Sequence, residues 1–196
     1  VDFGKAEAED LAVCPRSLLK KVITEAEDMN YTPMFSQEFE WFNYRESSSS
    51  VNEKDFKNLQ PLTSGMFGYS MLKLSENSEY FQDLFDLLAE FNVPLEGLHT
   101  ETGPGVTEAA IQYSGILEAA DRAVLFKTAA KEIGHKHGIV PSFMAKPSSE
   151  LPGCSGHVHQ SLWDLDKKNN LFYDEKQKDG MSTVMRSFLA GQLLCL

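Results

Sequence analysis

The sequence is poor in cysteine and has no long apolar run. Its three cysteines, Cys14, Cys154 and Cys195, are an odd number with no CxxC spacing. They indicate neither a disulfide framework nor a zinc ribbon, and they suit a reducing compartment. No apolar stretch approaches the ~18 residues typical of a membrane-spanning helix, and the N-terminal VDFGKAEAED lacks the basic start and apolar core of a signal peptide. We therefore expect a cytoplasmic protein with no membrane partner.

Positive charge is also scarce, because 18 lysines and arginines stand against 29 aspartates and glutamates and give a formal net charge of −11. Binding to nucleic acid depends on clustered lysine and arginine, so we expect no nucleic-acid partner. The surplus of acidic residues has two readings. It can serve solubility alone, or some carboxylates are held together in a site that a divalent cation makes tolerable.

Two common nucleotide-binding motifs are missing. There is no Walker A loop and no GxGxxG, which argues against a P-loop ATPase and a dinucleotide-binding enzyme. The triplet His99-Thr100-Glu101 has the HxE spacing of zinc deaminases, but the PCxxC motif that completes their site is absent. We therefore do not assign a deaminase.

The composition is typical of a protein with a buried core, since 42% of the 196 residues are hydrophobic and 24% are charged. Apolar periodicity predicts helices at 15–30, 78–92 and 115–137 and from about 179 onward. Strand patterns lie at 32–44, 67–74, around Glu101 and Glu108, at 139–145, at 155–163 and, briefly, at 171–173. Residues 47–55 have the composition of a flexible polar loop. Because helices and strands do not alternate regularly, we predict an α+β fold with a mainly antiparallel sheet.

Two short segments carry pairs of glutamates. Glu38 and Glu40 lie two positions apart on a predicted strand, so both carboxylates would project from one face, about 7 Å apart. Glu101 and Glu108 stand at the ends of ETGPGVTE, whose GPG turn folds the chain back and lets them approach each other. Taken alone, each pair also suits an ordinary solvent-exposed strand or hairpin.

A third segment, GHVHQSL, places two histidines on one strand face. Residues two apart on a strand share a face, so His157, His159 and Ser161 would point together. Val158 and Leu162 would then point the other way, into the core.

Two flanking segments adjoin these residues. Gly153 lies in the PGCSG stretch before the histidines, where a residue without a Cβ atom lets the backbone approach a ligand closely. Upstream, FMAKP ends a predicted strand with Lys146, which on its own is typical of a solvated cation.

Together, four glutamates and a histidine on strands of one sheet would form an oxygen-rich site with one nitrogen ligand. This donor set suits Mg²⁺ or Mn²⁺ better than structural zinc, which prefers cysteine and histidine. Proteins use paired hard cations to clamp a transferring phosphoryl group. The sequence therefore predicts a divalent-metal site suited to phosphoryl transfer.

The order and spacing of an ExE strand, ETGPGVTE, FMAKP and SGHVHQSL resemble the catalytic domain of the glutamine synthetase family. The similarity is greatest to the divergent glutamine synthetase-like proteins of fungi and animals, to which lengsin is related, and it covers nearly the whole chain. The resemblance implies that residues 1–196 form part of such a catalytic domain, with a curved, mainly antiparallel sheet flanked by helices.

The resemblance also implies two metal positions. Glu40, Glu101 and Glu108 match the ligands of the metal nearer the amino-acid substrate. Glu38 and His157 match ligands of the metal that engages the phosphates of ATP. We therefore expect Mg²⁺ or Mn²⁺ at two or more sites.

Three further positions match contacts to substrates in the family. His159 and Ser161 match contacts to ATP, the co-substrate, and Gly153 matches a backbone contact to glutamate. The implied reaction phosphorylates the γ-carboxylate of glutamate with ATP, after which ammonia or an amine attacks the acyl phosphate. Two alternatives stay open, which are a catalytically inactive, lengsin-like structural protein and a γ-glutamyl ligase that uses another amine.

The chain departs from the family pattern at both ends. The small N-terminal domain, which lends an acidic loop to a neighbouring subunit's active site, has no counterpart in these residues. The sequence also stops before the family's arginines for phosphate and glutamate and before the third ligand of the second metal. We expect this stretch alone to show little or no turnover, and we expect the full-length protein to be a homo-oligomer.

Overall fold

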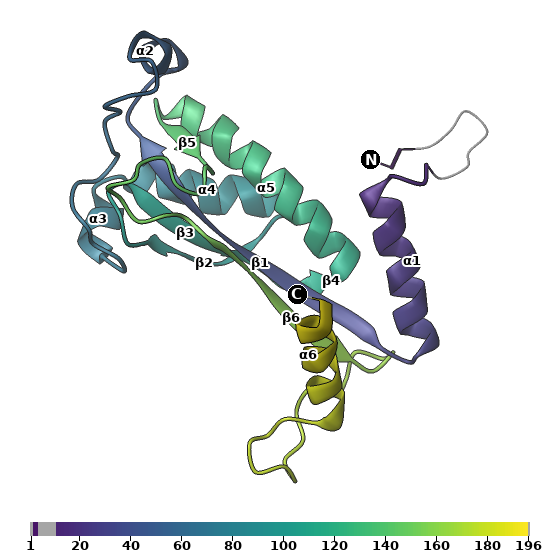
Figure 1. Cartoon of the computed structure of the whole chain (residues 1–196). Helices are drawn as coiled ribbons and strands as arrows, with labels where there is room; N and C mark the ends of the chain where they lie inside the picture. The colour runs from purple at the N-terminus through teal and green to yellow at the C-terminus, as the bar shows by residue number, and fades with distance from the viewer. Residues whose placement is uncertain (1, 4–10, 196) are drawn as a thin grey trace. The chain divides into compact units, whose positions relative to one another are not determined.

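The structure is a computed structural model that describes residues 2–3 and 11–195, and Figure 1 labels its helices and strands. The chain divides into two compact units. The first unit comprises the described residues up to Phe35, Ser114–Ala119 and the described residues from His159 onward. The second unit comprises Ser36–Tyr113 and Ala120–Val158.

The second unit is built on an antiparallel sheet. From residue 36 onward, β1 (Thr32–Tyr44) pairs with β3 (Val106–Ile111) and with β5 (Val140–Ser142). β2 (Leu95–Thr100) continues the sheet beyond β3. All of these pairings are antiparallel, so the predicted α+β fold with a mainly antiparallel sheet is confirmed, and β1 has the predicted bounds.

The three helices predicted before residue 140 are present as α1 (Pro15–Asp28), α4 (Ser78–Glu90) and α5 (Ile116–Lys136). Pro15 lies in the first turn of α1, where its missing N–H costs nothing. After α5, Gly138 has a φ of 65°, the left-handed conformation with which many helices end. Among the described residues, no helix combines the length and apolar character needed to cross a membrane.

An aromatic cluster fills the core between one face of the sheet and α5. Phe39 and Trp41 alternate with the glutamates along β1, and both rings meet Phe126 of α5, at centroid distances of 5.6 and 5.5 Å. Phe143 joins them, 5.7 Å from the Trp41 ring. Three residues of α4, Phe81, Leu84 and Leu88, pack into the same core. Large buried aromatic side chains dominate core energetics, so this cluster fixes which face of β1 is turned inward.

The first unit contains α1, the start of β1, β4 (Ser114–Gly115), the end of β6 (Gly156–Trp163) and α6 (Thr183–Cys195). Ser182 caps α6, because its hydroxyl accepts a hydrogen bond from the Met185 amide at 3.0 Å. The short strand predicted at 171–173 is wrong, since the described chain there forms an isolated bridge from Tyr173 to Met181.

Two further predictions fail because serine side chains start short helices. Residues 47–55, predicted as a flexible loop, contain α2 (Ser48–Glu53), at whose start Ser47 and Ser50 bond to each other's backbone amides in a capping box. The strand predicted at 67–74 is replaced by α3 (Met71–Ser75). There the Ser70 hydroxyl accepts from the Lys73 amide at 3.3 Å and caps the helix.

A nearly buried carboxylate next to α2 makes stability depend on pH. Glu46, whose side chain is 3% exposed, accepts hydrogen bonds from Lys54 Nζ at 2.5 Å, Ser50 Oγ at 2.6 Å and the Gln60 amide at 2.8 Å. These bonds, that from Lys54 first, lower the pKa of Glu46 to about 2 from 4.5. A carboxyl with a depressed folded-state pKa stabilises the fold above its unfolded pKa and loses that contribution as pH falls through the folded one.

We therefore expect the free energy of unfolding of the wild type to decrease as the pH is lowered from 4.5 to 2. This decrease should be smaller in Glu46→Gln. Urea unfolding at several pH values would measure it. Glu53→Gln, at an exposed position on α2, serves as the control and should retain the wild-type slope. Identical slopes in Glu46→Gln and the wild type would contradict the assignment.

Candidate metal centre

The register of the second unit's sheet places acidic side chains and a histidine on the face opposite the aromatic core. Glu40 of β1 lies directly across from Glu108 of β3, and His99 of β2 lies across from Glu108 on its other side. Glu38, two residues before Glu40, shares their face. Strand pairing thus brings Glu38, Glu40, Glu108 and His99 to one face of the sheet.

One group of possible ligands joins Glu38, Glu108 and His157, in which one ligand atom of each residue lies within 4.8 Å of the others. His157 Nδ1 is 3.2 Å from Glu38 Oε2 and 3.8 Å from Glu108 Oε1. Gly156, just before this histidine, permits the approach of β6 to β1, because a Cβ atom there would lie 3.0 Å from the Glu38 carbonyl oxygen.

A second group joins His99, Glu101 and Glu108, so that Glu108 belongs to both groups. His99 Nε2 is 3.4 Å from Glu108 Oε2, and its Nδ1 is 4.0 Å from Glu101 Oε2. Sequence reasoning gave His99 no role once the deaminase motif was rejected. The signal that could have found it is its position two residues before Glu101 at the end of a strand.

Glu40 is held by a different partner. Ser155, in the loop before β6, donates hydrogen bonds to its carboxylate from the backbone amide, at 3.1 Å, and from the hydroxyl. Among the described residues, neither close group of ligand atoms includes Glu40, although its backbone pairs with Glu108. The predicted trio of Glu40, Glu101 and Glu108 is therefore on one side of the sheet but is not drawn together as one cluster.

The electrostatics of the cluster are those of crowded carboxylates. Burial raises the pKa of Glu108; His99 opposes the shift, while Glu38, Glu40 and Glu101 add to it. Burial also acts to raise the pKa of Glu101. That effect is outweighed by hydrogen bonds from the amide and hydroxyl of Thr102, at 2.6 and 2.9 Å, so the net shift is downward.

These residues fit a divalent cation. The side chain of Glu108 is only 11% exposed, yet three other carboxylates act on it, and a buried or crowded anion is tolerable when a cation or hydrogen bonds offset it. Carboxylate oxygens with one imidazole nitrogen in each group are donors that Mg²⁺ and Mn²⁺ accept. The first group would provide Glu38, Glu108 and His157, and the second Glu101 and Glu108 with His99.

A buried polar network holds the turn between Glu101 and Glu108. The Asn43 amide side chain donates to the Gly105 carbonyl at 3.2 Å and to Thr107 Oγ1 at 3.1 Å. Its oxygen accepts from Trp41 Nε1 at 2.8 Å and from the Tyr80 hydroxyl at 2.9 Å. Gly105 itself has a φ of 74°, and a Cβ atom there would lie 2.4 Å from the Asn43 carbonyl oxygen, so this turn requires glycine.

The remaining predicted residues have mixed surroundings. A Cβ atom at Gly153 would lie 2.8 Å from the Ala145 carbonyl oxygen, so the backbone approaches its own chain closely there. In the first unit, His159 is exposed. The Ser161 hydroxyl donates to the Met34 carbonyl at 3.0 Å and accepts from Trp163 Nε1 at 3.0 Å.

The expectation for the opposite face of β6 is half wrong. Leu162 is buried as predicted, but Val158 is 52% exposed. Because Val158 lies in the second unit near the start of β6 and Leu162 in the first unit near its end, the two ends of one strand have different surroundings.

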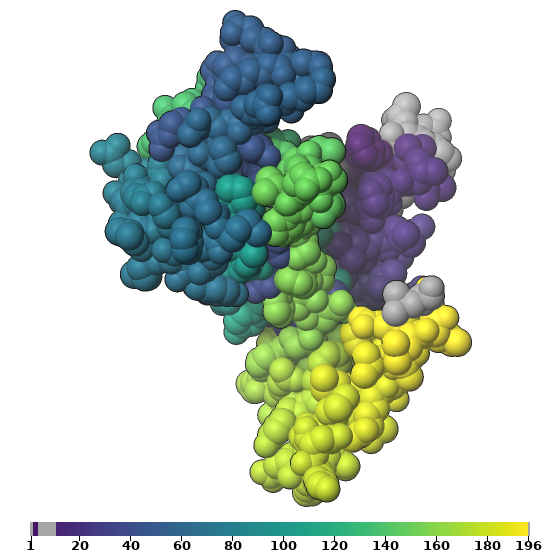
Figure 2. All heavy atoms as spheres, turned by 60° about the vertical axis from the view of Figure 1, so that its left-hand side comes forward, coloured from purple at the N-terminus to yellow at the C-terminus, as the bar shows by residue number. Residues whose placement is uncertain are grey.

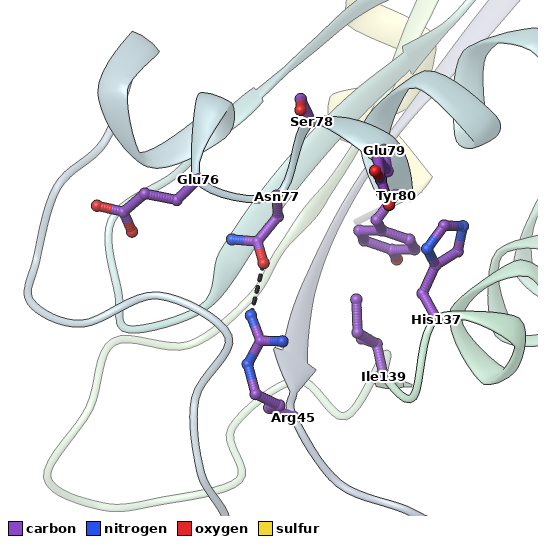
Figure 3. A pocket seen from close by; sticks show the side chains of 8 residues that line it. All are labelled: Arg45, Glu76, Asn77, Ser78, Glu79, Tyr80, His137 and Ile139. Atoms are coloured by element: carbon purple, nitrogen blue, oxygen red, sulfur yellow. Dashed lines mark hydrogen bonds between the residues drawn. The ribbon is translucent and has the colours of Figure 1, made fainter.

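A pocket of about 340 Å³ in the second unit lies at the start of α4, and Figure 3 shows the residues that line it. Its guanidinium, from Arg45, donates to Asn77 Oδ1 at 2.7 Å. Its imidazole, from His137, lies 2.8 Å from Asp83 Oδ2. None of the predicted site residues lines this pocket, and both the Arg45 guanidinium and the His137 imidazole already have partners, so we assign it no ligand.

The comparisons with known proteins agree with the fold. The sequence profile of the family "Glutamine synthetase, catalytic domain" matches residues 12–196, and the chain belongs to this family. The chain is 54% identical to type-1 glutamine synthetase 2 of Dictyostelium discoideum over 196 residues, which are all of this chain and 37% of that protein.

Two further proteins are similar to this chain. A glutamate–isopropylamine ligase of a Pseudomonas species is 36% identical over 98% of this chain and 42% of its own length. The Plasmodium falciparum glutamine synthetase solved by electron cryomicroscopy superposes with a TM-score of 0.79 at 21% identity, over 97% of this chain and 42% of that one, and so shares the fold. The chain thus spans about two fifths of the length of these relatives.

Breaking the hydrogen-bond network around Asn43 should lower the free energy of unfolding. Asn43→Ala would leave the Trp41 and Tyr80 donors without their acceptor, and each buried partner left unsatisfied costs roughly 1–3 kcal/mol. We expect urea unfolding to show a loss of at least ~2 kcal/mol, with weaker Mn²⁺ binding because the turn between the two glutamates loosens. Gln82→Ala, at an exposed position on α4, is the control. An Asn43→Ala protein as stable as this control would refute the role of the network.

Proposed function

We propose that this chain is part of an ATP-dependent ligase of the glutamine synthetase type, which forms a γ-glutamyl amide from glutamate and ammonia or another amine. The observation that carries the proposal is the cluster in which Glu108 lies between two histidines, His99 and His157, with Glu38 and Glu101 at its sides. Membership of the glutamine synthetase catalytic-domain family supports it.

In this proposal Mg²⁺ or Mn²⁺ is held by the two groups of ligands that share Glu108, with Glu40 as a further ligand. Bound cations of this kind neutralise phosphate charge and orient the transferring group. The protein's own contribution is to keep the carboxylates in place beforehand, because preorganised charges need no rearrangement during the reaction. The sheet pairing, the Thr102 bonds to Glu101 and the Ser155 bonds to Glu40 do this.

The substrates are assigned by resemblance. Gly153 would contact glutamate through its backbone, and His159 and Ser161 would contact ATP. The reaction transfers the terminal phosphoryl group of ATP to the γ-carboxylate. The amine nitrogen then attacks the γ-carbon, the new C–N bond forms, phosphate leaves with the electrons of the C–O bond, and the nitrogen gives up a proton.

The chain spans only 37% and 42% of the two relatives compared, so the activity is proposed for the whole protein that contains it. On the family pattern, we also propose that the whole protein is a homo-oligomer in the cytoplasm. A lengsin-like structural protein is the competing proposal. The presence of Glu or His at all five predicted metal positions favours the enzyme.

The metal assignment predicts a change in stability. A ligand that binds only the folded state stabilises it by about 2.7 kcal/mol at a concentration of 100 Kd, so Mn²⁺ or Mg²⁺ should raise the melting temperature. Glu101→Gln and Glu108→Gln should reduce this rise strongly. Glu118→Gln, at an exposed position of α5, should retain the metal-induced rise in melting temperature. An equal metal response in all three variants would contradict the assignment of the metal site.

The ligase assignment predicts a loss of turnover. Phosphate release from ATP in the presence of glutamate and an amine should fall by ~10²–10³ in Glu101→Gln, as when other enzymes lose one preorganised electrostatic group, and not in Glu118→Gln. The assay belongs on the whole protein that contains this chain, with the 196-residue stretch beside it as the form expected to be nearly inactive. Metal binding without phosphate release by the whole protein would support the structural alternative.

A further inference from the structure

Both carboxylate oxygens of Glu40 are engaged by one residue, Ser155. The Ser155 amide donates to Glu40 Oε2 at 3.1 Å, and the Ser155 hydroxyl donates to Glu40 Oε1. Both residues belong to the second unit, and Figure 2 shows the green part of the chain that includes the loop before β6 at the surface of the molecule. Because one residue supplies both donors, they face the carboxylate from the same side and span its two oxygens.

The main chain on both sides of Ser155 fixes its position. The Glu40 amide donates to the Ser155 carbonyl at 3.1 Å, so the two residues are also joined through their backbones. One residue earlier, the Cys154 amide donates to the Ala145 carbonyl at 2.7 Å. One residue later, the lack of a Cβ atom at Gly156 permits the close approach to β1. The backbone therefore sets where the two donors of Ser155 meet Glu40.

Thr102 offers a comparison within the same cluster. It also donates from its amide and its hydroxyl to one carboxylate, that of Glu101, at 2.6 and 2.9 Å. Both of these bonds go to a single oxygen, Glu101 Oε1. The other oxygen, Oε2, lies 4.0 Å from His99 Nδ1. The same pair of donors thus spans the carboxylate of Glu40 but not the carboxylate of Glu101.

This difference bears on which divalent cation the centre accepts. Mg²⁺ and Ca²⁺ carry the same charge, so the crowded carboxylates attract both ions and charge does not distinguish them. Ca²⁺ takes about six to eight oxygen ligands and often binds both oxygens of one carboxylate, whereas the smaller Mg²⁺ demands near-octahedral geometry. Selectivity between the two ions therefore depends on the number and the flexibility of the ligand oxygens.

The clamp on Glu40 restricts how that carboxylate can serve as a ligand. A cation that binds both oxygens of a carboxylate approaches from the side that the two oxygens share. At Glu40 the amide and hydroxyl of Ser155 take that side. Glu40 then has a lone pair of one oxygen to offer from its outer side, which is enough for Mg²⁺ but leaves Ca²⁺ one ligand short.

We propose that Ser155 sets the cation selectivity of the metal centre, because it holds Glu40 as a ligand that presents one oxygen and so disfavours Ca²⁺ relative to Mg²⁺. This inference rests on the metal site of the proposed function and specifies which ion that site selects. Ser155 acts through Glu40 and is therefore a positioning residue.

The test measures the dissociation constants of Mg²⁺ and Ca²⁺ by titration calorimetry in the whole protein that contains this chain. Ser155→Ala keeps the amide bond to Glu40 Oε2 and loses the hydroxyl bond to Oε1, so both oxygens become able to bind one ion. We expect the preference for Mg²⁺ over Ca²⁺ to fall by about tenfold or more, the size of one lost hydrogen bond to a charged group. Ser155→Gly should show the same fall, and Ser155→Thr, which retains a hydroxyl, should keep the wild-type preference.

Thr102→Val is the matched control, because it removes a hydroxyl that engages one oxygen of Glu101. It should change the affinities for Mg²⁺ and Ca²⁺ in the same direction and leave their ratio as in the wild type. Melting temperatures without added metal report on the fold of each variant separately from ion binding.

The outcomes separate the inference from the metal site on which it rests. A wild-type preference in both Ser155→Ala and Ser155→Gly would overturn the inference and leave the metal site standing. An equal fall in Thr102→Val would also overturn it, because the loss of any hydroxyl near the cluster would then suffice. If Glu108→Gln bound both ions as tightly as the wild type, the metal site of the proposed function would be wrong, and the inference with it.

Discussion

Repulsion between like charges is the constraint on which the second unit depends. Glu38 and Glu40 project from β1 beside Glu108, and the imidazoles of His99 and His157 lie close to these carboxylates. What opposes the repulsion is on the other face of the same strand, where Phe39 and Trp41 pack on α5. The aromatic core and the acidic face therefore both follow from the alternating direction of side chains along β1. The stability of the aromatic core makes the crowded carboxylates on the opposite face possible.

The polar network extends that support to the turn. Asn43 uses its side-chain oxygen for Trp41 and Tyr80 and its nitrogen for the turn at Gly105. Inside a protein, a hydrogen bond is stronger and an unsatisfied donor more costly than in water. The core thus does more than bury apolar surface, because through Asn43 it also specifies the conformation of the chain that links Glu101 to Glu108.

Much of this could be read from the sequence, for a physical reason. The alternation along β1 and the GPG turn are local, so the bounds of β1 and the common face of Glu38 and Glu40 could be predicted. Contacts between distant segments could not be: Ser155 on Glu40 joins residues 115 positions apart, and the position of His99 opposite Glu108 needs the pairing of β2 with β3. The helix α2 was missed for a different reason, because a run of serines suggests flexibility unless its capping bonds are considered.

The strict alternation of β1 also bears on how such a chain can change in evolution. Inserting or deleting one residue between Glu38 and Trp41 would move every following side chain to the opposite face, turning a glutamate toward Phe126 and an aromatic ring toward the histidines. An insertion of two residues would restore the face but separate Glu40 from Glu108. Lineages that descend from this sequence should therefore vary in length in surface loops such as 164–169, and β1 should keep its length even where its individual residues have been replaced.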